Sequence, residues 1–311
     1  MSATHFDLVA LGEPLVEFNQ VRPDDPADYR QGFGGDTSNT AIAAARLGAR
    51  AAYVSRLGDD SFGRMFLDLW RREGVDTSGV GIDPEAPTGI YFVAHGTRGH
   101  EFSYLRAGSA ASRMRPDDLP LGVVGSAAVL HVSGISQAIS ASACDTVFAA
   151  IEAARSAGAR ISYDSNLRLK LWPLSRARAV ITATIALCDW FTPSLEEAAQ
   201  LSGVSDPRAI LDWCHAGGAR VVALKMGAAG VWVSTPSGRE LVAGHRVHAV
   251  DATGAGDCFD GAFAARLIAG DAPVAAARYA NAAAALATTG YGAVAPLPRP
   301  ADVAAFLAKA A

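Results

Sequence analysis

Short apolar runs alternate with amphipathic segments along most of the chain. The run Phe6–Leu11 predicts a buried strand, and the alanine-rich residues 37–47 carry apolar positions at helical spacing. Residues 51–57 then predict a strand, and residues 61–72 predict an amphipathic helix with Ser61 as its N-cap. Strand followed by helix followed by strand is typical of a mainly parallel sheet with helices on both faces.

The same rhythm continues to the end of the chain. Further strands are expected at 127–132, 160–163, 190–192, 221–225, 231–235 and 240–243, and further helices at 142–156, 176–187, 255–269, 274–288 and 301–309. The last two strands are expected to form a hairpin through the intervening Pro236, Ser237 and Gly238. We therefore expect one α/β domain over residues 1–311.

Two stretches break the rhythm, because residues 13–33 and 88–104 alternate apolar and polar positions without intervening helices. Residues 90–93 and 101–104 carry the clearest alternation. The pattern favours a small antiparallel β lid, contributed by about 13–33 and 88–106, that could close over a site. Edge strands of the main sheet are the alternative that the pattern leaves open.

Composition restricts the partners. Of the 311 residues, 50% are hydrophobic and 19% charged, and the formal net charge is −4, so no overall positive field attracts nucleic acid or an anionic membrane. No apolar run has membrane-spanning length, and the first residues lack the features of a signal peptide. The four cysteines show no Cys-x-x-Cys spacing, which favours a reduced, cytoplasmic setting.

The chemistry concentrates in Asp251-Ala-Thr-Gly-Ala-Gly-Asp257, which opens a predicted helix. The unpaired amides and the dipole of a helix start favour a phosphate there, and Gly254 and Gly256 allow it to approach closely. A carboxylate would repel that phosphate, unless Asp257 takes the proton of an attacking hydroxyl during phosphoryl transfer. The plainer alternative is a helix-start acid favoured by the dipole. The string matches neither a dinucleotide fingerprint nor a Walker A loop.

This string resembles the C-terminal signature of the ribokinase-like (PfkB) family of carbohydrate kinases. A second motif, Gly34-Gly35-Asp36-Thr37-Ser38-Asn39, is similar to the family's di-glycine substrate motif, and the resemblance covers essentially the whole chain. It implies a ribokinase-like fold with a β lid, ATP as co-substrate, Asp257 as catalytic base, and an anion hole of the Gly254, Ala255 and Gly256 amides. It also implies homo-oligomers that pair through the lid.

The resemblance also assigns the nucleotide and metal sites. It implies ATP contacts from Asn166, Ser194, Lys225, Gly227, Gly230, Gly254, Gly256 and Asn281, with Asn281 near the adenine. For Lys225 alone, a solvated charge at a strand end is an equal alternative. Family members need Mg²⁺, placed with help from an Asn-x-x-Glu motif; here Glu197 keeps the acid, acting through water, but Ser194 replaces the amide. A monovalent cation near Asp251 stays open.

The acceptor sugar depends on charge. Residues 104–112 and 164–172 resemble segments of 2-keto-3-deoxygluconate kinases, and each contributes an arginine. Arg106 and Arg168 could grip the carboxylate of an acid sugar, whereas a neutral ketose needs no fixed cation. We expect Tyr91 and Tyr104 to supply hydroxyls and an apolar wall, Gly34 to let the main chain approach the sugar, and Gly35 and Asn39 to complete the substrate site.

The hypothesis is therefore phosphorylation of the 6-hydroxyl of 2-keto-3-deoxygluconate. A kinase of a neutral ketose, fructokinase-like, or of a related keto-deoxy acid is the main rival. A sugar or nucleotide sensor that keeps the fold without turnover is a rival of another class. The intact glycine string and Asp257 argue against the sensor.

Overall fold

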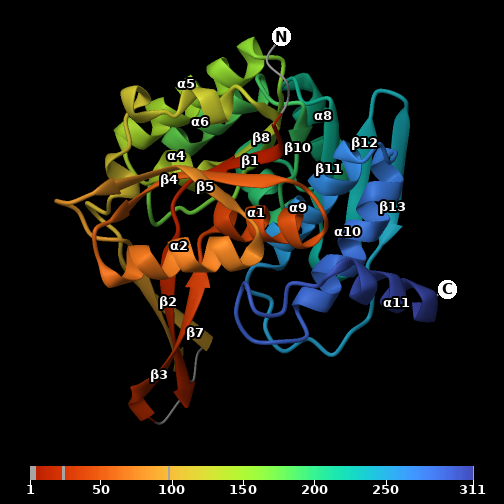
Figure 1. Ribbon diagram of the computed structural model, residues 1–311. Helices are drawn as coiled ribbons and strands as arrows, with labels where there is room; N and C mark the ends of the chain where they lie inside the picture. Colours follow the sequence, from red (N-terminus) through yellow and green to blue (C-terminus); the bar gives the residue numbers. More distant parts are fainter. Residues whose placement is uncertain (1–4, 23–24, 97–98, 311) are drawn as a thin grey trace.

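A nine-stranded sheet forms the centre of the computed structural model, which describes residues 5–22, 25–96 and 99–310 (Figure 1). Its strands, in spatial order, are β13 (Gly238–Ala243), β12 (Gly230–Thr235), β11 (Val221–Lys225), β10 (Trp190–Phe191), β9 (Arg160–Asp164), β8 (Ala127–Ser133), β1 (Phe6–Leu11), β4 (Ala51–Gly58) and β5 (Asp76–Asp83). β12 is antiparallel to both of its neighbours, and the other pairs are parallel. The predicted ribokinase-like α/β fold is confirmed.

Side chains of β1 alternate between two hydrophobic cores, one on each face of this sheet. Leu8 and Ala10 belong to one core, and Val9 and Leu11 belong to the other. Successive residues of a strand point to opposite faces, so a strand covered by helices on both sides reads as a continuous apolar run. This explains why the last four positions of β1, Leu8–Leu11, are all apolar.

The helices divide between these two cores. Their bounds are α1 (Asp36–Arg46), α2 (Ser61–Glu73), α3 (Leu121–Val124), α4 (Gly134–Ala138), α5 (Ala141–Ser156), α6 (Leu174–Ile185), α7 (Leu195–Ser202), α8 (Pro207–Ala216), α9 (Ala255–Ile268), α10 (Pro273–Ala287) and α11 (Pro300–Ala310). α1, α2, α9 and α10 cover the face that carries Leu8, whereas α5, α6, α7 and α8 cover the other. Short 3₁₀ turns lie at Ala111–Arg113, Pro116–Asp118 and Gly227–Ala229.

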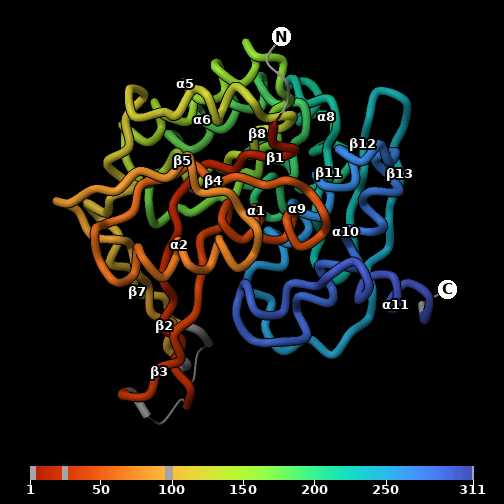
Figure 2. Tube along the Cα trace, viewed as in Figure 1, coloured from red at the N-terminus to blue at the C-terminus, as the bar shows by residue number. Residues whose placement is uncertain are grey.

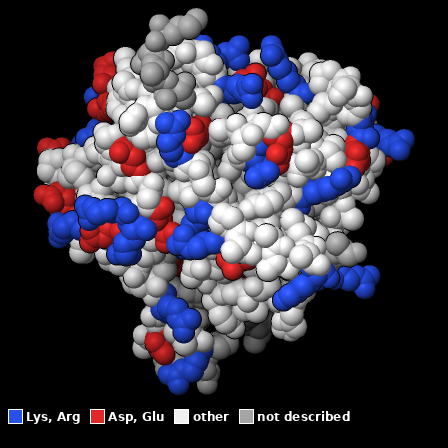
Figure 3. Space-filling model, turned by 45° about the vertical axis from the view of Figure 1, so that its right-hand side comes forward, with Lys and Arg blue, Asp and Glu red and all other residues white. Residues whose placement is uncertain are grey.

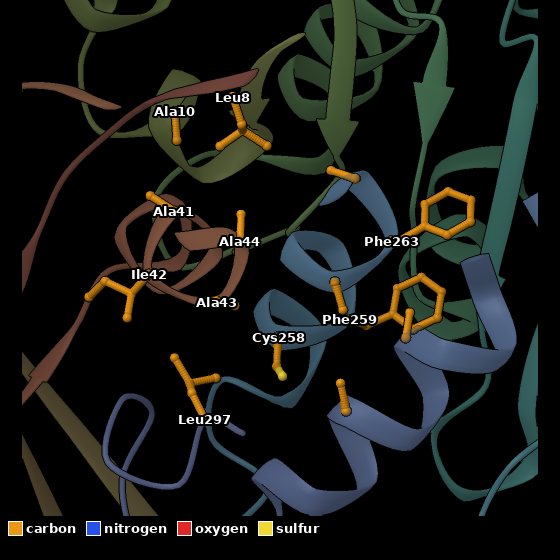
Figure 4. Close-up of a cluster of buried hydrophobic side chains, with 14 of the residues drawn as sticks. Leu8, Ala10, Ala41, Ile42, Ala43, Ala44, Cys258, Phe259, Phe263 and Leu297 are labelled. Atoms are coloured by element: carbon orange, nitrogen blue, oxygen red, sulfur yellow. The ribbon is translucent and has the colours of Figure 1, made fainter. Parts of the chain in front are cut away.

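α1 and α9 pack closely because small side chains lie between them (Figure 4). Ala41, Ala43 and Ala44 of α1 are buried against α9, and a Cβ at Gly261 would lie 2.5 Å from the Thr40 carbonyl oxygen. A larger residue at Gly261 would therefore force the two helices apart. This contact brings the di-glycine motif beside the start of α9.

The two irregular stretches form a second, four-stranded sheet, and the edge-strand alternative is wrong. Its order is β3 (Asp25–Gly34), β2 (Leu15–Arg22), β6 (Ile90–Gly96) and β7 (Gly99–Leu105). β2 and β6 are parallel, whereas the two outer pairs are antiparallel, so the expected all-antiparallel flap needs that correction. We refer to this sheet as the lid; its strands project away from the main body (Figure 2).

Local details differ from the sequence prediction in two respects. The N-cap of α2 is Asp60, whose Oδ1 accepts a hydrogen bond from the Gly63 amide at 2.7 Å, and Ser61 is the first helical residue. An aspartate is an equally good cap and holds its charge at the positive end of the helix. β5, α7 and α8 lie outside the elements that the apolar pattern predicted.

Neither the helices nor the charges contradict the expected absence of a membrane segment or a basic patch. Within residues 5–22, 25–96 and 99–310, every helix is too short or too polar for a bilayer crossing. On the face drawn in Figure 3, lysine and arginine side chains are interspersed with aspartate and glutamate. All four cysteines are free and buried.

Candidate active site

A cavity of about 950 Å³ lies between the lid and the carboxyl ends of the central strands. It brings together most of the residues that the sequence predicted: Gly34, Gly35, Asn39, Tyr91, Tyr104, Arg106, Asn166, Arg168, Ser194, Glu197, Lys225, Gly227, Gly254, Ala255, Gly256 and Asp257. Ligands of α/β proteins commonly bind at such carboxyl ends of parallel strands. Gly230 and Asn281 are not part of its wall.

The glycine string forms the floor of this cavity and starts α9. Gly254 is the N-cap with φ of 75°, and a Cβ there would lie 2.8 Å from the Ala293 Cβ, so both conformation and space require glycine. Among the described residues, the amides of Gly254 and Gly256 have no hydrogen-bond partner, whereas the Ala255 amide donates to the Ala252 carbonyl at 3.2 Å. Of the three amides in the predicted anion hole, that of Ala255 is engaged within the turn and the other two are free; the anion hole itself stays a prediction.

Asp257 lies in the first turn of α9, facing α1. Its Oδ2 accepts a hydrogen bond of 2.8 Å from Asn39 Nδ2. Burial and the nearby Asp36 carboxylate raise the pKa of Asp257 to about 7, although the Asn39 hydrogen bond and Lys225 oppose this rise. A carboxylate with a pKa near neutrality can take a proton and release it again, as a general base requires.

Asn39 makes a contact that the sequence prediction did not include. Its amide nitrogen binds the Asp257 carboxylate, and its Oδ1 is buried without a hydrogen-bond partner among the described residues. The neighbouring Thr40 hydroxyl donates to the Asp257 carbonyl at 3.3 Å. Two successive residues of α1 therefore orient Asp257.

Lys225 is the last residue of β11. It is not the solvated charge that the sequence allowed as an alternative. Its side chain is 14% exposed, and Nζ lies 3.1 Å from Asp164 Oδ2 and 3.0 Å from Asp260 Oδ2. Burial disfavours the charge, but Asp164 and Asp260 outweigh it and raise the pKa of Lys225. A Cβ at Gly256 would lie 3.5 Å from Nζ, so the ammonium group lies beside the anion turn.

The pKa values of the two aspartates around Lys225 are shifted in opposite directions. Burial disfavours the charge of Asp164, but Lys225 and hydrogen bonds hold its pKa below the usual range. Burial raises the pKa of Asp260 well above that range, and its hydrogen bond with Asp164 adds to the effect. The directions of these shifts favour the charge on Asp164 and a proton on Asp260, although the two acids titrate as a pair.

Arg106 lies at the end of β7 and is 9% exposed. Its Nε donates to Glu13 Oε2 at 2.7 Å, Nη2 forms a short bond to the same oxygen, and the guanidinium carbon lies 5.7 Å from the Tyr104 ring centroid. Burial raises the pKa of Glu13, against the effect of Arg106. The predicted carboxylate-binding arginine therefore already has a carboxylate partner within the protein.

Tyr91 and Gly34 form one contact. The Tyr91 hydroxyl donates to Glu17 Oε2 in a short hydrogen bond, and a Cβ at Gly34 would lie 2.7 Å from that hydroxyl oxygen. The Tyr91 and Tyr104 rings stack with centroids 5.8 Å apart. Gly34 therefore makes room for the Tyr91 side chain, a reason that the sequence prediction did not include, and Gly35 is required by its φ of 102°.

Arg168 and Glu197 form a pair on another part of the wall. Arg168 is 48% exposed, and its Nη1 lies 3.3 Å from Glu197 Oε1, while the Ser165 hydroxyl donates to Glu197 Oε2 at 2.7 Å. Burial and Asp164 raise the pKa of Glu197. Ser194 caps α7 by accepting a hydrogen bond from the Glu197 amide at 3.3 Å. The serine thus orients the first turn that carries Glu197.

Asn166 is the one non-glycine residue in the described chain with positive φ, at 30°. Its Nδ2 donates to Asp36 Oδ2 at 2.9 Å, and its Oδ1 is buried without a partner. Asparagine tolerates this conformation better than most residues, and such strain is common at functional sites. The orphan oxygen and the Glu197 carboxylate are donors of the kind that Mg²⁺ prefers. No cluster of three or more metal-binding His, Cys, Asp or Glu residues occurs within the described ranges.

Two residues that were predicted to contact ATP, Asn281 and Gly230, make close contacts with β13. Asn281 Nδ2 lies 3.2 Å from both the Val242 and Ala243 carbonyl oxygens and ties α10 to β13. Gly230 has φ of 105°, and a Cβ there would lie 2.1 Å from the Val242 carbonyl oxygen. Both residues therefore lie directly against β13. Neither residue lines the cavity, and the nucleotide contacts expected of them stay predictions.

Sequence reasoning missed four acids that line or support the cavity: Glu13, Asp36, Asp164 and Asp260. Asp36 stands in the di-glycine motif, and Asp260 follows Asp257 by three residues, one turn along the same helix. Those spacings were available from the sequence. Glu13 had no such signal, because its partners Arg106 and Ser109 are far away along the chain.

The chain is similar to known carbohydrate kinases over nearly its whole length. A model of the pfkB family of carbohydrate kinases matches residues 5–300. A 2-dehydro-3-deoxygluconokinase of Thermoproteus tenax is 36% identical over 308 residues, covering 96% of this chain and 94% of that protein. A probable fructokinase-4 of Arabidopsis thaliana is 36% identical over 317 residues, covering 96% of each.

Among solved structures, a putative ribokinase II from E. coli in complex with ATP and Mg²⁺ superimposes with a TM-score of 0.90. It is 27% identical in sequence, and the match covers 97% of this chain and 99% of that one. The family resemblance read from the sequence is thereby confirmed. The relatives do not distinguish an acid sugar from a neutral ketose, because both kinds are equally similar.

Proposed function

The chain belongs to the pfkB family of carbohydrate kinases, and we propose that it transfers the γ-phosphoryl group of ATP to the 6-hydroxyl of 2-keto-3-deoxygluconate. The observation that carries this proposal is a shared cavity: Arg106 and Arg168 line the same cavity as Asp257. A site with two guanidinium groups beside a general base suits an acceptor that carries a carboxylate.

Asp257 is the proton acceptor. The sugar hydroxyl oxygen bonds to the γ-phosphorus while the bond from that phosphorus to the β–γ bridging oxygen breaks, and the hydroxyl proton passes to Asp257. ADP leaves with the bridging oxygen. Asn39 orients the accepting carboxylate through its 2.8 Å hydrogen bond. A pKa of about 7 means that a large fraction of Asp257 is ionised at neutral pH.

Groups with positive electrostatic potential lie on one side of the position proposed for the phosphoryl group. The free amides of Gly254 and Gly256 and the start of α9 point to where charge develops, and the Lys225 ammonium lies beside them. Mg²⁺ bound with ATP would neutralise phosphate charge. Glu197, through water, and the orphan Asn166 Oδ1 are the residues here that fit it.

A neutral ketose is the second candidate acceptor, favoured by one specific contact. Glu13 already pairs with Arg106, so part of the arginine's charge is compensated before any ligand binds. The fructokinase relative has the same identity as the 2-dehydro-3-deoxygluconokinase relative, so similarity supports both candidates equally.

A coupled assay of ADP release separates the candidates. With Mg²⁺ and ATP, 2-keto-3-deoxygluconate should give a kcat/KM at least about a hundredfold above that of fructose, because each lost charged contact costs about tenfold or more. Arg106→Ala should raise the KM for the acid sugar far more than the KM for ATP. Preferred turnover of fructose would reject the acid sugar as the acceptor.

We also propose that the lid closes over the cavity and that the chain forms homo-oligomers. We infer that sugar binding draws the lid over the cavity, since Tyr91, Phe102 and Tyr104 of the lid line its wall. Pairing of two chains through the lid is also proposed, and sedimentation velocity with and without sugar would test it. A monovalent cation near Asp251 stays a prediction, which an activity titration with K⁺ would check.

A further inference from the structure

Glu13 is a buried acid whose side chain is held on every side. It follows β1, is 3% exposed, and binds Arg106 with Oε2 while its Oε1 accepts a short hydrogen bond from the Ser109 hydroxyl. A Cβ at Gly89 would lie 3.0 Å from Oε1, and one at Gly35 would lie 2.5 Å from the Glu13 carbonyl oxygen. The di-glycine turn and the residue that precedes β6 of the lid therefore both lie against Glu13.

The geometry of the pair leaves part of Arg106 unused. A guanidinium has five N–H donors in a planar fork, and Glu13 takes only Nε and one hydrogen of Nη2, both through the same oxygen. Nη1 has no hydrogen-bond partner among the described residues, and Arg106 borders the cavity. The edge formed by Nη1 and the second hydrogen of Nη2 can still bind a carboxylate with two parallel bonds.

A buried arginine needs such a support. An uncompensated guanidinium at 9% exposure would be costly, and a flexible one would lose side-chain entropy on binding a ligand. Glu13 removes both difficulties, because it compensates the charge and fixes the plane of the guanidinium. Arg168 has no comparable support: it is 48% exposed and has one pairing contact with Glu197.

We propose that Glu13 is a positioning residue that presents the free edge of Arg106 to the carboxylate of the acid sugar, and that Ser109 fixes Glu13. This inference rests on the proposed function and names the source of its selectivity. Glu13 does not touch the reacting atoms; it determines which acceptor the cavity prefers. The prediction is a loss of acid-sugar recognition without a matching loss of phosphoryl transfer.

The test uses Glu13→Gln and Ser109→Ala in the full-length enzyme. Glu13→Gln keeps the size and one acceptor oxygen but removes the charge, and should raise the KM for 2-keto-3-deoxygluconate about tenfold or more while kcat and the KM for ATP change less than about threefold. Ser109→Ala should raise the acid-sugar KM by about threefold. In both variants the kcat/KM for fructose should change little, so the acid-to-neutral ratio falls.

The control is Glu73→Gln, which removes the charge from a similar pair outside the cavity. Glu73 binds Arg46 with both carboxylate oxygens, at 2.8 and 2.9 Å, and both side chains are mostly buried. This variant should lose thermal stability, as we also expect of Glu13→Gln, without any change in the acid-to-neutral ratio.

Three results would overturn the inference. If wild-type enzyme phosphorylates the acid sugar and Glu13→Gln retains its KM, Glu13 does not position Arg106 for the ligand, although the proposed function stands. If Glu13→Gln loses acid and neutral activity equally, its role is structural only. If wild-type enzyme does not phosphorylate the acid sugar, the proposed function and this inference fail together.

Discussion

Asn39 and Asp257 are 218 residues apart in sequence, yet the Asn39 amide nitrogen lies 2.8 Å from the Asp257 carboxylate. The contact joins the two motifs that most clearly resemble the family, and the close packing of α1 on α9 makes it possible. Each motif would be an ordinary helix start by itself. Together they orient a carboxylate beside two free amides of a helix N-terminus.

Replacing Asp257 by Asn should remove turnover but not folding. We expect kcat to fall about 10³-fold, because general-base catalysis contributes roughly 10²–10⁴-fold. The KM values for ATP and sugar should change little, since the Asn side-chain oxygen can still accept from Asn39. Single-turnover kinetics and calorimetric titration of both substrates would measure this. Turnover at the wild-type rate would exclude Asp257 as the base.

The same variant should also stabilise the protein at alkaline pH. The folded-state pKa of Asp257 is about 7, above the ordinary value of 3.8, so the folded state binds a proton that the unfolded state has lost between these values. Wild-type stability should therefore decrease as pH rises from about 4 to about 7, and Asp257→Asn should not show this contribution. Urea denaturation of both proteins at pH 5 and pH 8 provides the test. A stability gain at pH 5 that equals the gain at pH 8 would contradict it.

Activity should follow the opposite direction of pH. Because only ionised Asp257 accepts a proton, kcat/KM for the sugar should rise with pH and level off above about 7. Asp36→Asn removes a neighbouring carboxylate that raises the pKa of Asp257, so the midpoint should move to lower pH. Asn39→Ala should move it to higher pH, since it removes a hydrogen bond to the ionised form. A midpoint that is the same in all three proteins would show that another group titrates.

The two acids around Lys225 should respond unequally to substitution. Asp164 has a lowered pKa and Asp260 a raised one, so Asp260→Asn replaces a protonated side chain, whereas Asp164→Asn removes the charge partner of a buried ammonium. We expect Asp164→Asn to cost about 3 kcal/mol of unfolding free energy and Asp260→Asn about 1 kcal/mol or less. Chemical denaturation would measure both. Equal losses would show that the proton is not located on Asp260.

Asn281→Ala tests whether Asn281 contacts the nucleotide. Its amide ties α10 to the Val242 and Ala243 carbonyl oxygens, so its loss should lower the unfolding free energy by about 1–2 kcal/mol. The KM for ATP should stay within about twofold of the wild-type value. Lys225→Met is the matched comparison from the cavity wall, and it should raise the KM for ATP about tenfold. An increase of similar size in the KM for ATP of Asn281→Ala would support the predicted adenine contact.

Local pattern determined much of this protein. The apolar run of β1, the alanine-rich α1 and the glycine string at the start of α9 each carry their own signal, because strand burial, helix spacing and backbone freedom depend on neighbouring residues. The role of Asp257 as catalytic base was predicted in the same way, since an acid within an anion-binding turn is unusual wherever that turn lies.

Only the tertiary structure decided what the remaining polar residues do. Arg106 lies against Glu13, Lys225 lies between two aspartates, and Asn281 faces carbonyl groups of β13, and none of these partners within the protein was predicted from the sequence. A charged side chain takes the nearest opposite charge that packing leaves within reach, and the cost of burying it alone makes that choice strict. Its partner is set by how strands and helices distant in sequence come together, and no local spacing contains that information.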